Sequence, residues 1–248
     1  MINPSDLVCH IEWLSQARVL CIGDLMLDRF VYGEVERTSP EAPVPVLGIK
    51  RQTAMLGGVG NVARNLISLG SSATLLSVVG DDEVGRTLTQ MIGEEERIEP
   101  HLLVEPGRPS TEKTRFLAGG QQLLRTDRET RNWISDRSAE NLLRMAEDIV
   151  PHSDVLVLSD YAKGILTAEL CQALIACALD DVHYGFALVR SGGDVEEHHL
   201  IRALLVVLQH QLDGVAHVAQ FAGLGFAELH TTGHLSVVDI EAGNDAFG

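Results

Sequence analysis

Val19-Leu20-Cys21-Ile22-Gly23-Asp24 is a short apolar run that ends in a glycine and a carboxylate. A run of this kind, closed by a turn signal, predicts a buried strand that delivers a polar loop. The pattern returns at residues 74–82, which end in Gly80-Asp81-Asp82, and at residues 155–160, which end in Ser159-Asp160. Buried strands with polar ends are typical of a parallel sheet that binds ligands at the carboxyl edge.

Segments with helical periodicity lie between these strands. Val62, Leu66 and Leu69 recur at helical spacing before Gly70, and residues 138–149 and 167–178 show a similar period. The alternation of strands and helices favours an α/β fold with a doubly wound, mostly parallel sheet flanked by helices.

Two segments do not fit the alternation. Residues 30–47 are irregular and include Ser39-Pro40-Glu41-Ala42-Pro43-Val44-Pro45-Val46, and prolines at this density belong in loops or edge strands. Residues 114–125 bracket Ala118-Gly119-Gly120 and predict a hairpin. We expect segments near 30–50 and 112–126 to form a small β-lid on the main sheet.

The composition shifts after about Asp180. Residues 181–248 contain no proline and no lysine but seven of the ten histidines, and residues 200–212 are expected to form a helix. We therefore divide the chain into a core at 1–180, with the lid, and an atypical C-terminal segment at 181–248. The histidines have no metal-ligand spacing, so no metal-binding residue is identified.

The charge balance excludes some classes of partner. The 248 residues carry a formal net charge of -16, which disfavours nucleic acids and anionic membranes because both require a basic surface. No stretch is apolar enough to span a bilayer, and residues 1–9 lack the pattern of a signal peptide. Four cysteines without paired spacing are consistent with a reducing compartment. We expect a cytoplasmic protein.

Gly57-Gly58-Val59-Gly60-Asn61 opens a predicted helix. Glycines let the backbone approach a ligand, and a helix N-terminus offers unpaired N–H groups. The loop is neither a dinucleotide-binding fingerprint nor a Walker loop, and alone it favours a structural turn over a binding site.

Several segments in a fixed order make the loop informative. In chain order they are residues 23–29, residues 39–46, the glycine loop, Gln121-Gln122-Leu123-Leu124-Arg125, and Ser159-Asp160-Tyr161-Ala162-Lys163-Gly164. Together, over residues 17 to about 178, they resemble the heptose-7-phosphate kinase branch of the ribokinase (PfkB) carbohydrate kinase family. The resemblance implies a ribokinase-like sheet with a β-lid. Because residues 180–238 lack the family's strings, we expect the C-terminal part to be incomplete or atypical.

The resemblance also implies site residues. Asp28 would grip sugar hydroxyls, with loop capping as the alternative, and Lys163 would lie near the substrate phosphate, with a surface lysine as the alternative. Lys113 and Arg125 would add positive charge from the lid, or would be merely solvated. The residues placed around the substrate are Asp28, Gly57, Gly58, Asn61, Lys113, Arg125, Asp160 and Lys163.

The last residues resemble the family's catalytic signature, roughly Asp-Thr-Thr-Gly-Ala-Gly-Asp-Ala-Phe. Asp239, Asp245, Ala246 and Phe247 match at the same spacing, but Ala242-Gly243-Asn244 replaces the Gly-Ala-Gly. The resemblance implies Asp245 as the catalytic base and Ala242, Gly243 and Asn244 as the anion hole. The alternative is a coincidental match in a replaced tail.

The function implied is phosphorylation of a sugar phosphate with ATP and Mg²⁺. The specific expectation is D-glycero-D-manno-heptose 7-phosphate, phosphorylated at its anomeric hydroxyl in lipopolysaccharide core heptose synthesis. The resemblance also implies a homodimer that pairs through the β-lid. Two alternatives remain: a family kinase of another sugar, and a truncated kinase-like domain that only binds sugar phosphate or dimerises.

Overall fold

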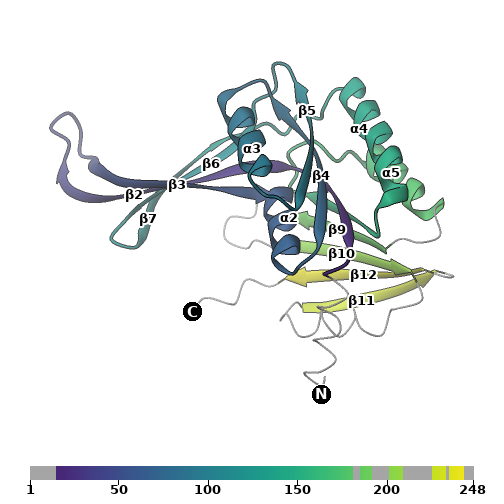
Figure 1. Cartoon of the computed structure of the whole chain (residues 1–248). Helices are drawn as coiled ribbons and strands as arrows, with labels where there is room; N and C mark the ends of the chain where they lie inside the picture. Colours follow the sequence, from purple (N-terminus) through teal and green to yellow (C-terminus); the bar gives the residue numbers. More distant parts are fainter. Residues whose placement is uncertain (1–14, 181–184, 192–200, 209–224, 233–234, 243–248) are drawn as a thin grey trace.

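The structure is a computed structural model that describes residues 15–180, 185–191, 201–208, 225–232 and 235–242. The described residues form an eight-stranded sheet and a separate four-stranded sheet (Figure 1). Helices cover the larger sheet, and the smaller sheet extends away from it. The predicted α/β class, with a mostly parallel sheet and a β-lid, is confirmed.

The larger sheet has the strand order β11-β12-β10-β9-β8-β1-β4-β5. The neighbours from β9 to β5 pair in parallel, whereas β10, β12 and β11 pair antiparallel. The strands are β1 (Arg18–Gly23), β4 (Ser72–Gly80), β5 (Ile98–Glu105), β8 (Val155–Asp160), β9 (Gly185–Ser191), β10 (Ile201–Leu208), β11 (Gly225–Thr232) and β12 (Leu235–Ala242).

The helix expected at residues 200–212 is wrong. The structure has β10 in this range, paired antiparallel with β9 on one side and β12 on the other. Periodicity cannot separate a short apolar run in a helix from one in a buried strand. Here the ladder on both sides satisfies the backbone, and the β-branched pair Val206-Val207 suits a strand.

Helices cover both faces of the larger sheet. The helices α2 (Val59–Ser68) and α3 (Glu83–Gly93) lie on one face, and α4 (Asp136–Ile149) and α5 (Ala168–Asp180) lie on the other (Figure 1). A short 3-10 turn, residues 150–152, follows α4.

The core follows from the alternation of side chains along β1. Val19 and Cys21 are buried in the cluster that includes residues of α2 and α3, whereas Leu20 and Ile22 are buried in the cluster of α4 and α5. Both faces of β1 are therefore covered, which explains its unbroken apolar sequence.

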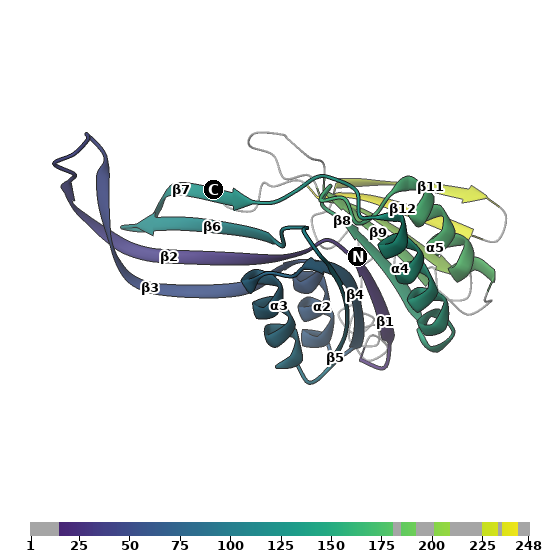
Figure 2. The same cartoon turned by 90° about the horizontal axis from the view of Figure 1, so that it is seen from above.

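The lid is the four-stranded sheet, with the order β3-β2-β6-β7. It projects from the larger sheet as an arm, as Figure 2 shows from above. Its strands are β2 (Leu25–Thr38), β3 (Pro45–Gly58), β6 (Thr111–Ala118) and β7 (Gln121–Arg128).

The structure is more regular in the lid than the prolines suggested. The range 30–47, expected to be irregular, is β-strand except for the connection at residues 39–44. Pro45 begins β3, which is an edge strand of the lid, and a proline is tolerated there because no neighbour needs its missing N–H. Only Asp24 separates β1 from β2, so one continuous chain links the core to the lid.

Candidate active site

Asp24 organises the carboxyl edge of the larger sheet. Its carboxylate is fully buried and accepts backbone N–H bonds from Tyr161 at 2.7 Å, Lys163 at 3.1 Å and Ile165 at 3.3 Å. Its carbonyl oxygen accepts the N–H of Val59, the first residue of α2, at 2.9 Å. One aspartate therefore joins β1, the loop after β8 and the start of α2.

The loop after β8 is held in a specific conformation. The Asp160 carboxylate accepts the N–H of Ala162 at 2.9 Å, and Ala162 has a φ of 55°, which is uncommon for a residue other than glycine. This turn directs Lys163 inward, so that only 8% of the residue is exposed. The unusual backbone is supported by its hydrogen bonds to two aspartates.

Asp28 lies against the glycine loop. It is on β2, half-buried, and its carboxylate pairs with the Arg115 guanidinium from β6. A Cβ atom placed on Gly57 would lie 2.3 Å from the Asp28 Oδ2 atom, so only glycine leaves room for this carboxylate. Gly58 has a φ of 59° and ends β3 directly before α2.

Two lysines share one carboxylate between the core and the lid. Lys163 Nζ lies 2.9 Å from Glu129 Oε1, and Lys113 Nζ lies 3.0 Å from Glu129 Oε2. Lys113 also contacts Asp127 at 3.1 Å, and Asp127 contacts Arg125 at 3.0 Å. Burial is the largest single effect on the pKa of the Glu129 carboxyl and would raise it. The hydrogen bonds and charges of Lys163 and Lys113 together outweigh burial, so the pKa is lowered.

The structure brings together most of the residues that the resemblance implied. Lys113 is the register partner of Asp28 in the parallel pair of β6 and β2, and Lys163 reaches the same cluster through Glu129. Asn61 is exposed on the first turn of α2, and Arg125 lies on β7.

The expected anion hole and catalytic base fall mostly beyond the described part of the chain. Ala242 is the last residue of β12, while Gly243, Asn244 and Asp245 lie outside the described residues. Their roles stay predictions.

Sequence reasoning missed four residues of the site: Asp24, Arg108, Arg115 and Glu129. Asp24 had a signal, because it directly follows a buried strand and a glycine. Arg108 donates to the carbonyl oxygens of Lys163 and Asn132, and no local pattern predicts such a contact. No local sequence pattern predicts the role of Glu129 either, because its partners come from distant segments.

Asp24 should make stability depend on pH. Burial raises the pKa of its carboxyl to about 6, although its three backbone donors lower it. Because this pKa exceeds the ordinary value of 3.8, the stabilising contribution is present below about pH 4 and is lost as the pH rises through about 6. Compared with Asp24→Asn, the wild type should lose at most about 3 kcal/mol of unfolding free energy between pH 4 and pH 7.

Urea unfolding of both proteins at the two pH values measures this difference. The other carboxylates titrate alike in both proteins, so they cancel. A stability difference between wild type and variant that is the same at both pH values would contradict the assignment.

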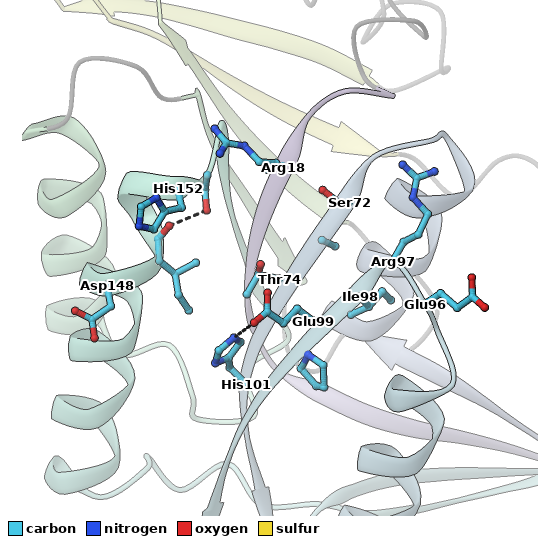
Figure 3. A pocket seen from close by; sticks show the side chains of 14 residues that line it. Arg18, Ser72, Thr74, Glu96, Arg97, Ile98, Glu99, His101, Asp148 and His152 are labelled. Atoms are coloured by element: carbon cyan, nitrogen blue, oxygen red, sulfur yellow. Dashed lines mark hydrogen bonds and ion pairs between the residues drawn. The ribbon is translucent and has the colours of Figure 1, made fainter.

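A separate hollow opens at the opposite edge of the larger sheet. It has a volume of about 880 Å³ and is lined by the amino-terminal ends of β1, β4 and β5 and by residues near the end of α4. Arg18, Arg97 and His152 line it together with Glu96 and Asp148 (Figure 3). This mixed charge favours no single ligand, and the hollow lies away from the Asp24 and Lys163 edge.

Among the residues that the structure describes, no group of three or more His, Cys, Asp or Glu side chains is arranged to hold a metal ion. Within the same part, no helix is long and apolar enough to cross a membrane.

The chain is similar to curated bacterial proteins. It is 53% identical over 175 residues to the bifunctional protein HldE of Paramagnetospirillum magneticum. The aligned part covers 71% of this chain and 36% of that protein. It is 52% identical over 176 residues to the bifunctional protein HldE of Acidiphilium cryptum, with coverage of 71% and 36%. The chain thus spans about a third of the length of these relatives.

Solved structures support the fold. Phosphofructokinase-2 from Escherichia coli in complex with fructose-6-phosphate superposes with a TM-score of 0.54 at 20% identity, covering 72% of this chain and 55% of that one. A phosphofructokinase-like protein from Staphylococcus aureus superposes with a TM-score of 0.55 at 10% identity, covering 83% and 84%. The family model described as pfkB family carbohydrate kinase matches residues 16–184. With this match over most of its length, the chain belongs to the pfkB family of carbohydrate kinases.

Proposed function

We propose that this chain transfers a phosphoryl group from ATP to a sugar phosphate, with D-glycero-D-manno-heptose 7-phosphate as the substrate and its anomeric hydroxyl as the acceptor. The observation that carries the proposal is the pair of ammonium groups, Lys163 and Lys113, gathered around one carboxylate, with Lys113 the register partner of Asp28. Asp28 would bind sugar hydroxyls and the lysines the phosphate already on the sugar. Lysine suits a phosphate as a compact point charge.

The phosphoryl donor would bind toward the C-terminal segment. Ala242, Gly243 and Asn244 would hold the ATP phosphates through backbone N–H groups, and Asp245 would accept the proton of the attacking hydroxyl. ATP supplies the phosphoryl group, and Mg²⁺ that arrives bound to its phosphates neutralises their charge. The cellular setting that fits this substrate is lipopolysaccharide core heptose synthesis in the cytoplasm.

We also propose a homodimer that pairs through the lid, and the exposed apolar side chains of the lid support it. Several of its large apolar side chains are between 41% and 56% exposed, which is unusual on one small sheet. A second copy of the lid would cover them. The exposed residues on the lid and its turn are Val35, Val44, Ile49, Met55, Leu123 and Leu124.

The test is ADP release from Mg-ATP by the whole chain with heptose 7-phosphate. We expect turnover with the sugar phosphate that falls sharply, to a low but measurable rate, with the unphosphorylated heptose. Equal turnover with fructose 6-phosphate would instead favour a family kinase of another sugar. Folded protein that binds sugar phosphate but releases no ADP would overturn the kinase proposal in favour of a sugar-phosphate-binding domain.

A further inference from the structure

The Glu129 carboxylate occupies the position between two cations where an anion is best held. Its two oxygens lie 2.9 Å and 3.0 Å from Lys163 and Lys113, one oxygen for each ammonium group. The three side chains are mostly removed from solvent, at 18%, 11% and 15% exposed for Glu129, Lys163 and Lys113 respectively. One small anion thus receives donors from both the core and the lid.

The low exposure of the two lysines to solvent indicates why an anion lies between them. Two ammonium groups held together away from water repel each other and require a compensating anion. Donors that converge from two sides on one small anion also fit a phosphate group, which offers several acceptor oxygens and up to two negative charges. The carboxylate therefore satisfies the lysines in the way that a bound phosphate would.

Glu129 lies on the connection after β7, outside the regular elements of the fold. It directly follows β7, which ends at Arg128, and belongs to no helix or strand. A few residues further on, the chain is tied to the core: Arg108 donates to the Asn132 carbonyl, and Ile134 N–H donates to the Gly164 carbonyl at 2.9 Å. The segment is thus anchored downstream, while Glu129 is held by its side-chain pairs.

We propose that Glu129 is an internal counter-anion that fills the phosphate position between Lys163 and Lys113 and is displaced when a phosphorylated ligand binds. The identity of that ligand as a sugar phosphate rests on the proposed function. The exchange makes Glu129 a specificity-determining residue. A dianionic phosphate competes with the carboxylate for both lysines, whereas a neutral sugar does not.

The test compares Glu129→Gln with Glu34→Gln in the full chain. Glu34 pairs with Lys50 on the lid, both side chains about 60% exposed, so the control removes the same charge away from the site. Titration calorimetry with inorganic phosphate is the probe. Because the glutamine no longer competes as an anion, we expect phosphate to bind Glu129→Gln about tenfold more tightly than Glu34→Gln.

Unchanged or weaker phosphate binding by Glu129→Gln, relative to the control, overturns the proposal. Glu129→Asp is the second variant, because it keeps the charge but is too short to span both lysines. It should bind phosphate more tightly than wild type by a smaller factor, and equal or weaker binding again counts against displacement.

The phosphate-binding measurement tests the counter-anion separately from the kinase proposal, because it does not depend on turnover. Tighter phosphate binding by Glu129→Gln in a chain that never releases ADP would support the counter-anion and reject the kinase proposal. Turnover in the wild type, with phosphate binding weakened by Glu129→Gln, would support the kinase proposal and reject the counter-anion.

Discussion

Gly57→Ala is expected to lower kcat/KM for the sugar phosphate about 100-fold while the chain stays folded. The new Cβ would lie 2.3 Å from Asp28 Oδ2 and 2.7 Å from Met26 Cγ, which no real contact tolerates. Because both atoms belong to side chains, the side chains would move and the backbone would stay in place. The Asp28 carboxylate would leave its place beside Arg115 and no longer meet the sugar hydroxyls that we propose it binds.

Gly48→Ala is the matched control for this substitution. Gly48 lies on the same strand, β3, and its added Cβ would come no nearer than 3.6 Å to another atom, the Glu34 carbonyl oxygen. Its kcat/KM should stay close to that of the wild type. If Gly57→Ala matched Gly48→Ala, the close approach of Asp28 to this glycine would have no functional role.

A double-mutant cycle tests whether the effect passes through Asp28. In an Asp28→Asn background, which already lacks the carboxylate, Gly57→Ala should cause little further loss of kcat/KM. Losses that simply multiply would mean that the alanine disturbs the site by another route, such as Met26. Circular dichroism and thermal unfolding of each variant separate these outcomes from misfolding.

The sequence was sufficient to predict those features of the structure that depend on residues close together along the chain. The apolar run at residues 19–22 predicts β1 because both of its faces are buried. The glycine at 57 was expected to let a ligand approach, whereas the structure shows the Asp28 side chain against it. The position of Asp24 after β1 was visible, but its role was not. That role depends on N–H groups of residues more than 130 positions away, which the fold brings together.

The sequence was insufficient where the contacts join distant segments or where a pattern is ambiguous. The sequence neighbours of Glu129 form no motif, and its role follows from its ion pairs with Lys113 on β6 and Lys163 after β8. At residues 201–208 the apolar run is short enough for a helix or a strand, and pairing with β9 and β12 decides the outcome. Tertiary structure, not local preference, determines both features.

Lys163→Met is expected to lower kcat/KM for the sugar phosphate about 1000-fold, the loss typical of truncating one partner of a buried charge pair. Methionine keeps much of the length of the side chain but removes the ammonium group, which is 2.9 Å from Glu129. Glu129 would then be paired with Lys113 alone, and the incoming phosphate would lose one of its two cations. Steady-state kinetics with heptose 7-phosphate measures the loss.

The division of that loss between KM and kcat identifies the role of Lys163. The phosphate at position 7 is remote from the reacting anomeric hydroxyl, so we expect most of the loss in KM. Lys50→Met, which removes an exposed lysine from the lid, should leave both constants unchanged. With the unphosphorylated heptose, Lys163→Met and wild type should turn over at similar rates, because that sugar lacks the phosphate that we propose Lys163 binds. A 1000-fold loss with that sugar too would mean that Lys163 acts on the reacting centre or on the fold, and not on the substrate phosphate.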